Sequence, residues 1–213
     1  MSKYAVFGMG KFGRSLAREL GEMGNEVLAV DASEEKLQEV ERYVTCCVVA
    51  NVTDEEAVSQ IGVEDYDAVI VSIGDNVENS LICSIILKEL GVKKIWAKAT
   101  GDLHAKILEK IGVERVILPE REMGIRIAHH ITNNNIIDYI SLSEEHQLVE
   151  ITIKKEWIGK SISEINFRTK YGINIIGIRH GEDFTVNPQA DHVIKEHDVL
   201  SIVATNETIK NLL

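Results

Sequence analysis

Residues 4–13, Tyr-Ala-Val-Phe-Gly-Met-Gly-Lys-Phe-Gly, decide the fold of this chain. An apolar run ends at Phe7, and Gly8, Gly10 and Gly13 then open a helical segment in a G-x-G-x-x-G pattern. The first glycine permits a tight turn, the second lets backbone N–H groups approach a pyrophosphate, and the third lets the helix pack close to the strand. The motif therefore predicts a phosphate-binding loop at the N-terminus of the first helix.

Short apolar runs alternate with helical segments through the first 118 residues. The runs are continuously apolar, which is typical of parallel strands buried on both faces. They lie at Lys3–Phe7, Glu26–Val30, Cys46–Ala50, Asp67–Ile73, Lys93–Lys98 and Glu114–Leu118. A β-α unit repeated this regularly predicts the α/β class, with a doubly wound parallel-sheet Rossmann domain over residues 1–118.

The helical segments carry their own start and stop signals. Thr53, with Glu56 three residues later, predicts a capping box at the start of one helix. Four helices are predicted to end in a glycine at the left-handed cap position, namely Gly24, Gly62, Gly91 and Gly112.

A different pattern follows residue 118. Pro119 favours a helix start, and a helix is predicted over Glu120–Thr132 within a crossover helix and linker at residues 119–140. The apolar residues of this helix lie on more than one side, which suggests that it packs against a second subunit.

The remaining residues, 141–213, predict a small α+β C-terminal domain. A hairpin turn is expected at residues 180–183 and a capped short helix at residues 161–164. Strands are predicted at Leu148–Ile153, Ile173–Arg179, Phe184–Val186 and Val199–Ala204.

Composition excludes several classes of protein. Of the 213 residues, 45% are apolar and 27% are charged, as in ordinary globular chains and unlike disordered or collagenous ones. The 34 acidic and 23 basic residues give a net charge of −11, which repels a nucleic acid backbone and predicts no nucleic acid partner. The longest uncharged apolar runs are far shorter than the ~18 residues that cross a bilayer, so no direct membrane insertion is expected.

Two further features predict a cytoplasmic protein. The first eight residues have neither the long apolar segment nor the cleavage site of a signal peptide. The three cysteines, Cys46, Cys47 and Cys83, have no metal-binding or redox spacing and are expected to be core thiols.

An acidic residue completes the nucleotide-binding pattern. Asp31 follows the second predicted strand, 18 residues after Gly13, where a carboxylate accepts hydrogen bonds from an adenosine ribose and repels a 2′-phosphate. Ligands of this fold lie outside the carboxyl ends of the strands, so residues at the ends of the later strands are also predicted to bind the nucleotide. Each of these later residues would equally suit an ordinary turn or a solvated charge. The predicted cofactor-binding residues are Gly8, Met9, Gly10, Lys11, Phe12, Gly13, Asp31, Ser33, Asn51, Val52, Ser72, Gly74 and Lys98.

The chain lacks the groups expected of a hydride-transfer enzyme. Such an enzyme needs a substrate domain that places an acid or base against the nicotinamide. His129 and His130 point in different directions on one helix, and His192 and His197 do not share a face. The pattern favours a nucleotide sensor with no catalytic residues, but a small NAD-dependent oxidoreductase or an NAD(H) redox sensor remains open, because NAD and ATP share the adenosine half.

Several motifs resemble one protein family over the whole chain. The family comprises the KtrA/TrkA-type cytosolic regulatory subunits of bacterial potassium uptake channels, which are built from RCK domains. The Pro-Glu-x-x-Met-Gly segment and the second domain make the resemblance specific. The matching stretches are residues 4–13, 49–55, 71–74, 118–124 and 168–174.

The resemblance implies a nucleotide-sensing function without chemistry. An N-lobe would bind ATP or ADP, and homodimers would assemble into an octameric ring. That ring would dock on a KtrB-like membrane channel subunit and gate it from the inner face of the cell membrane. Lys11 stands where the family often has Arg, and a point-charge ammonium makes no bidentate phosphate contact, so this departure bears on how ATP is distinguished from ADP. From its place in the first helical turn, Lys11 is expected to reach the terminal phosphate, while a solvated lysine at a helix start is the open alternative.

Two more sites follow from the resemblance. Glu120 residues of two subunits would meet near the ATP phosphates and hold a divalent cation, while a helix-capping role is the simpler alternative. In related proteins the C-terminal lobe binds cyclic di-AMP at a dimer interface. Apolar walls with one guanidinium and one amide suit that ligand, although a surface arginine and a turn asparagine in a plain dimerisation module would look the same. The residues assigned to this second site are Ile162, Arg168, Asn174, Ile175 and Pro188.

Overall fold

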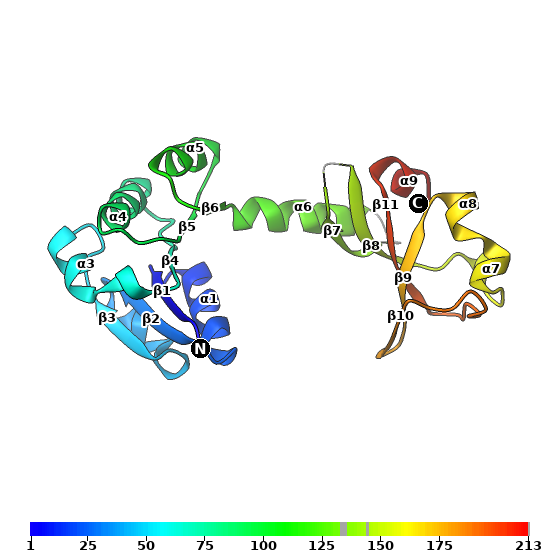
Figure 1. The fold of residues 1–213 in the computed structure, drawn as a ribbon, viewed down its shortest axis with the longest axis horizontal. Helices are drawn as coiled ribbons and strands as arrows, with labels where there is room; N and C mark the ends of the chain where they lie inside the picture. The colour runs from blue at the N-terminus through cyan, green and yellow to red at the C-terminus, as the bar shows by residue number, and fades with distance from the viewer. Residues whose placement is uncertain (133–135, 144, 213) are drawn as a thin grey trace. The chain divides into compact units, whose positions relative to one another are not determined.

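The structure is a computed structural model that describes residues 1–132, 136–143 and 145–212. It divides into two compact units, Met1–Glu120 and Arg121–Leu213 (Figure 1). Each unit has its own sheet and its own hydrophobic core.

The first unit is built on a six-stranded parallel sheet in the order β3-β2-β1-β4-β5-β6. β1 lies at the centre, with Ala5 opposite Leu28 of β2 and Val69 of β4. The sequence prediction of a doubly wound parallel sheet is therefore confirmed. The strands are β1 (Lys3–Phe7), β2 (Glu26–Asp31), β3 (Cys46–Val49), β4 (Ala68–Val71), β5 (Ile95–Lys98) and β6 (Arg115–Ile117).

Helices cover both faces of this sheet. Alternate residues of β1 point to opposite faces, so that Val6 packs with α1 and α2 while Ala5 and Phe7 pack with α3, α4 and α5. The helices of this unit are α1 (Lys11–Glu22), α2 (Glu34–Gln38), α3 (Glu55–Ile61), α4 (Val77–Glu89) and α5 (Asp102–Ile111), with short 3-10 turns η1 (Glu41–Tyr43) and η2 (Val63–Asp65). A further helix, α6 (Pro119–Thr132), begins at the end of this unit and belongs mostly to the second.

The helix ends follow the sequence signals with one exception. Gly24, Gly62, Gly91 and Gly112 all have the positive φ predicted for them. The predicted cap at Thr53 is wrong: α3 begins one residue later, and the Asp54 carboxylate accepts from the N–H groups of Glu56 and Ala57. Thr53 instead forms a turn with Asn51, because its N–H and its hydroxyl both donate to Asn51 Oδ1.

The cysteines differ in burial more than their sequence context suggested. Cys83 on α4 is fully buried, and this burial raises the pKa of its thiol to about 12, so the thiol stays protonated at neutral pH. Cys46, which was also expected in the core, is exposed. The reason is that β3 is the edge strand of the sheet and has a neighbour on one side only.

The second unit contains a five-stranded antiparallel sheet in the order β10-β9-β11-β8-β7. The predicted α+β class is confirmed. A strand that the sequence analysis did not predict, β7, lies in the segment assigned to the linker and pairs with β8. The strands are β7 (Ile136–Ser141), β8 (His146–Thr152), β9 (Asn174–His180), β10 (Asp183–Val186) and β11 (Val199–Thr205).

Short helices cover one face of the second sheet. Trp157 fills the centre of this core, with Phe167 edge-on at a ring-centroid distance of 4.9 Å. The capping box predicted at Ser161 and Glu164 is present at the start of α7. The helical elements are η3 (Lys155–Trp157), α7 (Ile162–Ile165), α8 (Phe167–Tyr171) and α9 (Asn206–Leu212).

Several apolar side chains of α6 are exposed to solvent. Met123, Ile125, Ile127 and Ile131 are each at least 44% exposed. The side chains of His129 and His130 lie outside the described part of the chain. Across the residues that the structure describes, no helix combines the length and the apolar character that a bilayer span requires.

The packing of α1 on β1 generates a first prediction. A Cβ atom at Gly13 would collide with the Gly8 carbonyl oxygen and lie 2.6 Å from Ser72 Oγ, whereas a Cβ at Gly10 has no heavy atom within 4 Å. We expect Gly13→Ala to destabilise the first unit by about 1–3 kcal/mol through overpacking. Gly10→Ala, the matched control, should change its stability by less than about 1 kcal/mol.

Hydrogen exchange of the β1 and α1 amides in the nucleotide-free full chain measures both effects. Equal protection of these amides in the two variants would contradict the close approach of α1 to the strand.

Candidate functional site

The loop between β1 and α1 leaves the start of the helix open to a ligand. Gly8 has φ +98°, a left-handed conformation that favours glycine, and its N–H donates to Val30 O at 2.7 Å. Gly10 is the N-cap residue and offers no capping side chain, and the fully described first turn of α1 carries no acidic residue. The N–H groups and the positive end of the helix dipole are therefore available to an anion.

Asp31 at the end of β2 holds this loop in place. Its Oδ2 accepts the Met9 N–H at 2.6 Å, its Oδ1 accepts the Ser33 N–H at 2.8 Å, and Lys36 Nζ lies 3.9 Å from Oδ2. The side chain is almost entirely buried. The sequence analysis predicted only a ribose contact for Asp31, so its structural role in ordering the phosphate loop is an addition.

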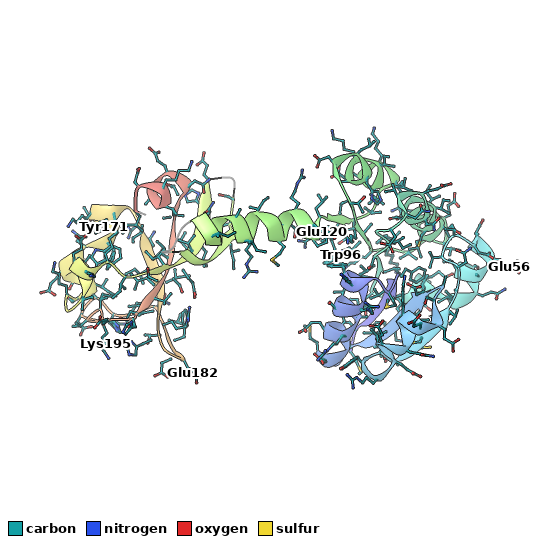
Figure 2. All side chains as sticks on the ribbon, turned by 180° about the vertical axis from the view of Figure 1, so that it is seen from behind. Glu56, Trp96, Glu120, Tyr171, Glu182 and Lys195 are labelled. Atoms are coloured by element: carbon teal, nitrogen blue, oxygen red, sulfur yellow. The ribbon has the colours of Figure 1, made fainter. Side chains whose placement is uncertain are left out.

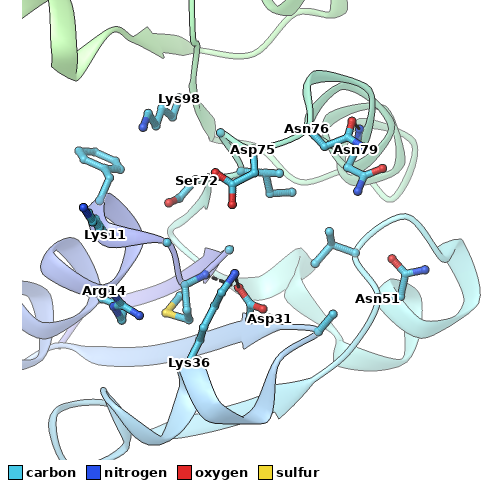
Figure 3. Close-up of a pocket in the computed structure, with 18 of the residues that line it drawn as sticks. Lys11, Arg14, Asp31, Lys36, Asn51, Ser72, Asp75, Asn76, Asn79 and Lys98 are labelled. Carbon is cyan, nitrogen blue, oxygen red and sulfur yellow. Dashed lines mark hydrogen bonds and ion pairs between the residues drawn. The ribbon is translucent and has the colours of Figure 1, made fainter.

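A cavity of about 630 Å³ lies over this loop, at the carboxyl ends of the parallel strands (Figure 3). Asn51 and Lys98 lie on opposite sides of it, with Asp31 below in the view. Its lining residues are Gly8, Met9, Gly10, Lys11, Phe12, Arg14, Asp31, Ala32, Lys36, Asn51, Val52, Ser72, Ile73, Gly74, Asp75, Asn76, Asn79, Lys98 and Glu120.

Most of the predicted site residues meet at this cavity. Gly13 and Ser33 do not line it: Gly13 lies against the strand, and Ser33 caps α2 by accepting the Lys36 N–H. Lining residues that the sequence analysis missed include Arg14 and Lys36. Both lie within one or two turns of a predicted motif residue, and this helical spacing was the only signal for them.

Three other missed residues come from the β4–α4 connection and the first turn of α4. Asp75 precedes the helix, Asn76 is its N-cap and accepts the Asn79 N–H, and all three line the cavity. A capping motif is the sequence signal that marks this helix start. The capping motif predicts where the helix begins, but it does not indicate that these residues line a cavity.

The charged residues of the cavity are mostly paired. Arg14 Nη1 lies 2.7 Å from Glu39 Oε1, and Lys98 Nζ lies 2.6 Å from Glu120 Oε1. The Lys98 ammonium, through its hydrogen bond, holds the pKa of the Glu120 carboxyl below its usual value. Figure 2 shows Glu120 where α6 begins. Lys11, by contrast, has no ion pair with any described residue.

One buried polar atom at the cavity has no hydrogen-bond partner among the described residues. Ser72 is 4% exposed, and its Oγ makes no hydrogen bond to any described residue. A buried hydroxyl left unsatisfied costs about 1–3 kcal/mol, so a ligand oxygen placed beside it would recover that cost. The described residues also contain no cluster of three His, Cys, Asp or Glu side chains that suits a metal ion. The cavity is therefore suited to a polyanion held by N–H groups and basic side chains.

The five residues predicted for the second ligand lie on neighbouring elements of the second unit. Ile162 of α7 and Ile175 of β9 pack against the same core. Pro188 follows Asn187, whose N–H donates to Ile176 O on β9. Arg168 and Asn174 are exposed. Arg168 has no ion pair within the described residues, so its guanidinium is available to a ligand.

Comparison with known proteins identifies both units. Residues 4–119 match the family model of the TrkA-N domain, and residues 147–213 match that of the TrkA-C domain. The Ktr system potassium uptake protein C of Bacillus subtilis is 42% identical over 203 residues, which cover 95% of this chain and 92% of that protein. The Ktr system potassium uptake protein A of the same organism is 41% identical over 208 residues, covering 98% and 94%.

Solved structures share the fold. A structure described as the GsuK channel superposes with a TM-score of 0.73 at 20% identity over 99% of this chain, and the GsuK RCK domain does so with a TM-score of 0.69 at 20% identity, also over 99%. The chain spans 38% and 46% of those longer chains, and at this identity the likeness concerns the fold alone. Together with the full-length relatives, the two domain matches show that the chain belongs to the TrkA/KtrA family of RCK-domain regulatory subunits of bacterial potassium uptake systems.

Proposed function

We propose that this protein is a nucleotide-sensing regulatory subunit that binds ATP or ADP in its first unit and does no chemistry itself. The observation that carries the proposal is the uncapped N-terminus of α1, which faces a cavity lined by four basic residues in a chain of net charge −11. Local positive charge in an acidic protein favours a phosphate-rich ligand.

The end of the cavity opposite Asp31 favours a nucleoside polyphosphate over NAD. Lys98 lies there as a charged group, and it suits a terminal phosphate better than an uncharged nicotinamide amide. NAD binding is the alternative, because the adenosine half of the two ligands would meet the same loop and Asp31.

The expected partners are a second copy of the chain and a membrane potassium channel subunit. The relatives are named as potassium uptake proteins, and α6 carries exposed apolar side chains on more than one side, which self-association would bury. Dimers assembling into an octameric ring beneath a KtrB-like channel subunit are the arrangement we propose, with the protein cytoplasmic and peripheral to the membrane.

A divalent cation at Glu120 belongs to the same proposal. One carboxylate is too few for Mg²⁺ or Ca²⁺, which take six or more oxygen ligands. Glu120 suits the role only together with nucleotide phosphates and a second copy of the chain, and it would first have to leave Lys98.

We propose cyclic di-AMP as the ligand of the second unit. Arg168 is an exposed guanidinium without an ion pair among the described residues, and Ile162 and Ile175 provide apolar surface from adjacent elements. A single chain would supply half of the site, and a twofold dimer would present two such halves to one symmetric ligand.

The nucleotide proposal is tested by thermal shift, because a ligand that binds only the folded state raises the melting temperature by mass action. We expect ATP and ADP to stabilise the full chain more than NAD or NADH at equal concentration. Gly10→Val, which places a side chain on the pyrophosphate path, should abolish the shift, and Asp31→Ala should weaken ATP and ADP together.

Gly10→Ala is the matched control for folding at that position. A folded Gly10→Val protein that still binds ATP with wild-type affinity would show that the site is wrong. A larger shift with NAD than with either adenine nucleotide would favour the alternative.

The cyclic di-AMP proposal is tested by calorimetry on the full chain. Arg168→Ala should eliminate binding, because the guanidinium would pair with the ligand phosphates, and the melting temperature should stay unchanged because Arg168 has no described ion pair to lose. Lys170→Ala, on the same short helix, is the control and should bind normally. Binding that survives Arg168→Ala, or no binding by the wild type, would leave the second unit as a dimerisation module.

A further inference from the structure

The two members of the Lys98–Glu120 ion pair differ greatly in burial. The Lys98 side chain is 13% exposed, whereas that of Glu120 is 71% exposed. A buried ammonium is costly unless an anion stays beside it. The exposed Glu120 carboxylate returns to water at little cost, because it keeps most of its hydration while it is paired. Glu120 is therefore an exchangeable partner for a lysine whose charge a nearby anion stabilises.

The strand order places Lys98 at one end of the cavity. The neighbouring strands β2, β1, β4 and β5 end in Asp31, the glycine loop, Ser72 and Lys98 in that order. With a strand spacing of about 4.8 Å, β2 and β5 lie about 14 Å apart. A nucleotide with its ribose at Asp31 and its first phosphates over Gly10 would extend its phosphate chain toward Lys98.

The ammonium of Lys98 is also held beside the start of α1. Its Nζ lies 5.9 Å from the centroid of the Phe12 ring in the first turn, and 3.4 Å from the position of a Cβ at Gly74. It therefore adds a full charge next to the helix terminus that attracts phosphate. Lys11 is exposed and has no ion pair among the described residues, so nothing described fixes its ammonium beforehand. Preorganisation favours Lys98 over Lys11 as the residue that contacts the end of the phosphate chain.

We propose that Lys98 recognises the γ-phosphate of a nucleoside triphosphate, and that this phosphate replaces Glu120 as the counterion of Lys98. This inference rests on the nucleotide-binding function proposed above and assigns to Lys98 the role that the sequence analysis gave to Lys11. The exchange releases Glu120, the second residue of α6, through which the chain leaves the first unit. When a γ-phosphate is bound, the start of α6 therefore loses its contact with Lys98.

The ratio of ATP affinity to ADP affinity measures the inference, by calorimetry on the full chain. Lys98→Met keeps the aliphatic stem and removes the charge, and we expect it to lower this ratio by about 10- to 100-fold, as for loss of a charge-assisted hydrogen bond. Lys11→Met is the matched control, because Lys11 also lines the cavity, and it should leave the ratio within about twofold.

Glu120→Gln tests the exchange of partners. Measured without a divalent cation, so that the cation role proposed for Glu120 plays no part, the ATP-to-ADP ratio should rise by about 3- to 10-fold because the competing carboxylate is removed. In the Lys98→Met background the same substitution should have no effect, since the coupling in a double-mutant cycle requires both side chains.

The outcomes separate the two proposals. Wild-type protein that binds neither ATP nor ADP overturns the proposed function and this inference with it. Equal losses of ATP and ADP in Lys98→Met overturn the inference alone, and so does a selective loss of ATP in Lys11→Met without one in Lys98→Met. An effect of Glu120→Gln that persists without Lys98 overturns the exchange.

Discussion

The hydrogen bond from the Met9 N–H to the buried Asp31 carboxylate is the contact on which the candidate site depends. It joins the glycine loop after β1 to the end of β2 at 2.6 Å, and the same carboxylate accepts the Ser33 N–H that begins the next connection. One side chain thus sets the position of two segments that come from different β-α units. Without it the buried Met9 N–H would lose its partner, and the loop would lose the anchor that holds the start of α1 open to phosphate.

Two basic side chains of the site have carboxylate partners that an incoming polyanion can replace. Arg14 and Lys98 each have a carboxylate partner that is more exposed than they are. An incoming phosphate can replace such a carboxylate, which is then solvated by water at little cost. This arrangement suits a sensor, because a ligand shifts an equilibrium only through contacts that differ between the two states of the protein. Replacement of a carboxylate by a ligand phosphate is a contact that differs between the free and the bound state.

The second unit is organised in another way. Its helices cover one face of the sheet, and on the opposite face Glu150 of β8 accepts from Arg179 of β9 and from Ser201 of β11. These contacts tie three adjacent strands together independently of the apolar core around Trp157. Of the residues proposed to bind cyclic di-AMP, four lie on helices and strands around that core, and Pro188 follows β10.

The sequence by itself determined the fold class and all of the described strands except β7. Continuous apolar strands, capping glycines and the G-x-G-x-x-G motif depend on backbone conformation and local packing, which neighbouring residues specify. For this reason the six parallel strands, the left-handed glycines and the Ser161 capping box were predicted correctly. The cap predicted at Thr53 was wrong because two neighbouring side chains take over its role. Asn51 accepts the Thr53 N–H, and Asp54 caps the helix in place of Thr53.

Only the tertiary structure decided which side chains share the site and which of them are paired. Lys98 and Glu120 are 22 residues apart and meet because β5 ends where α6 begins. Arg14 and Glu39 meet because two helices cover the same face of the sheet. Burial, which makes Lys98 dependent on a partner and Glu120 exchangeable, is a property of the packed chain. No local pattern encodes it, because it depends on every element that surrounds the residue.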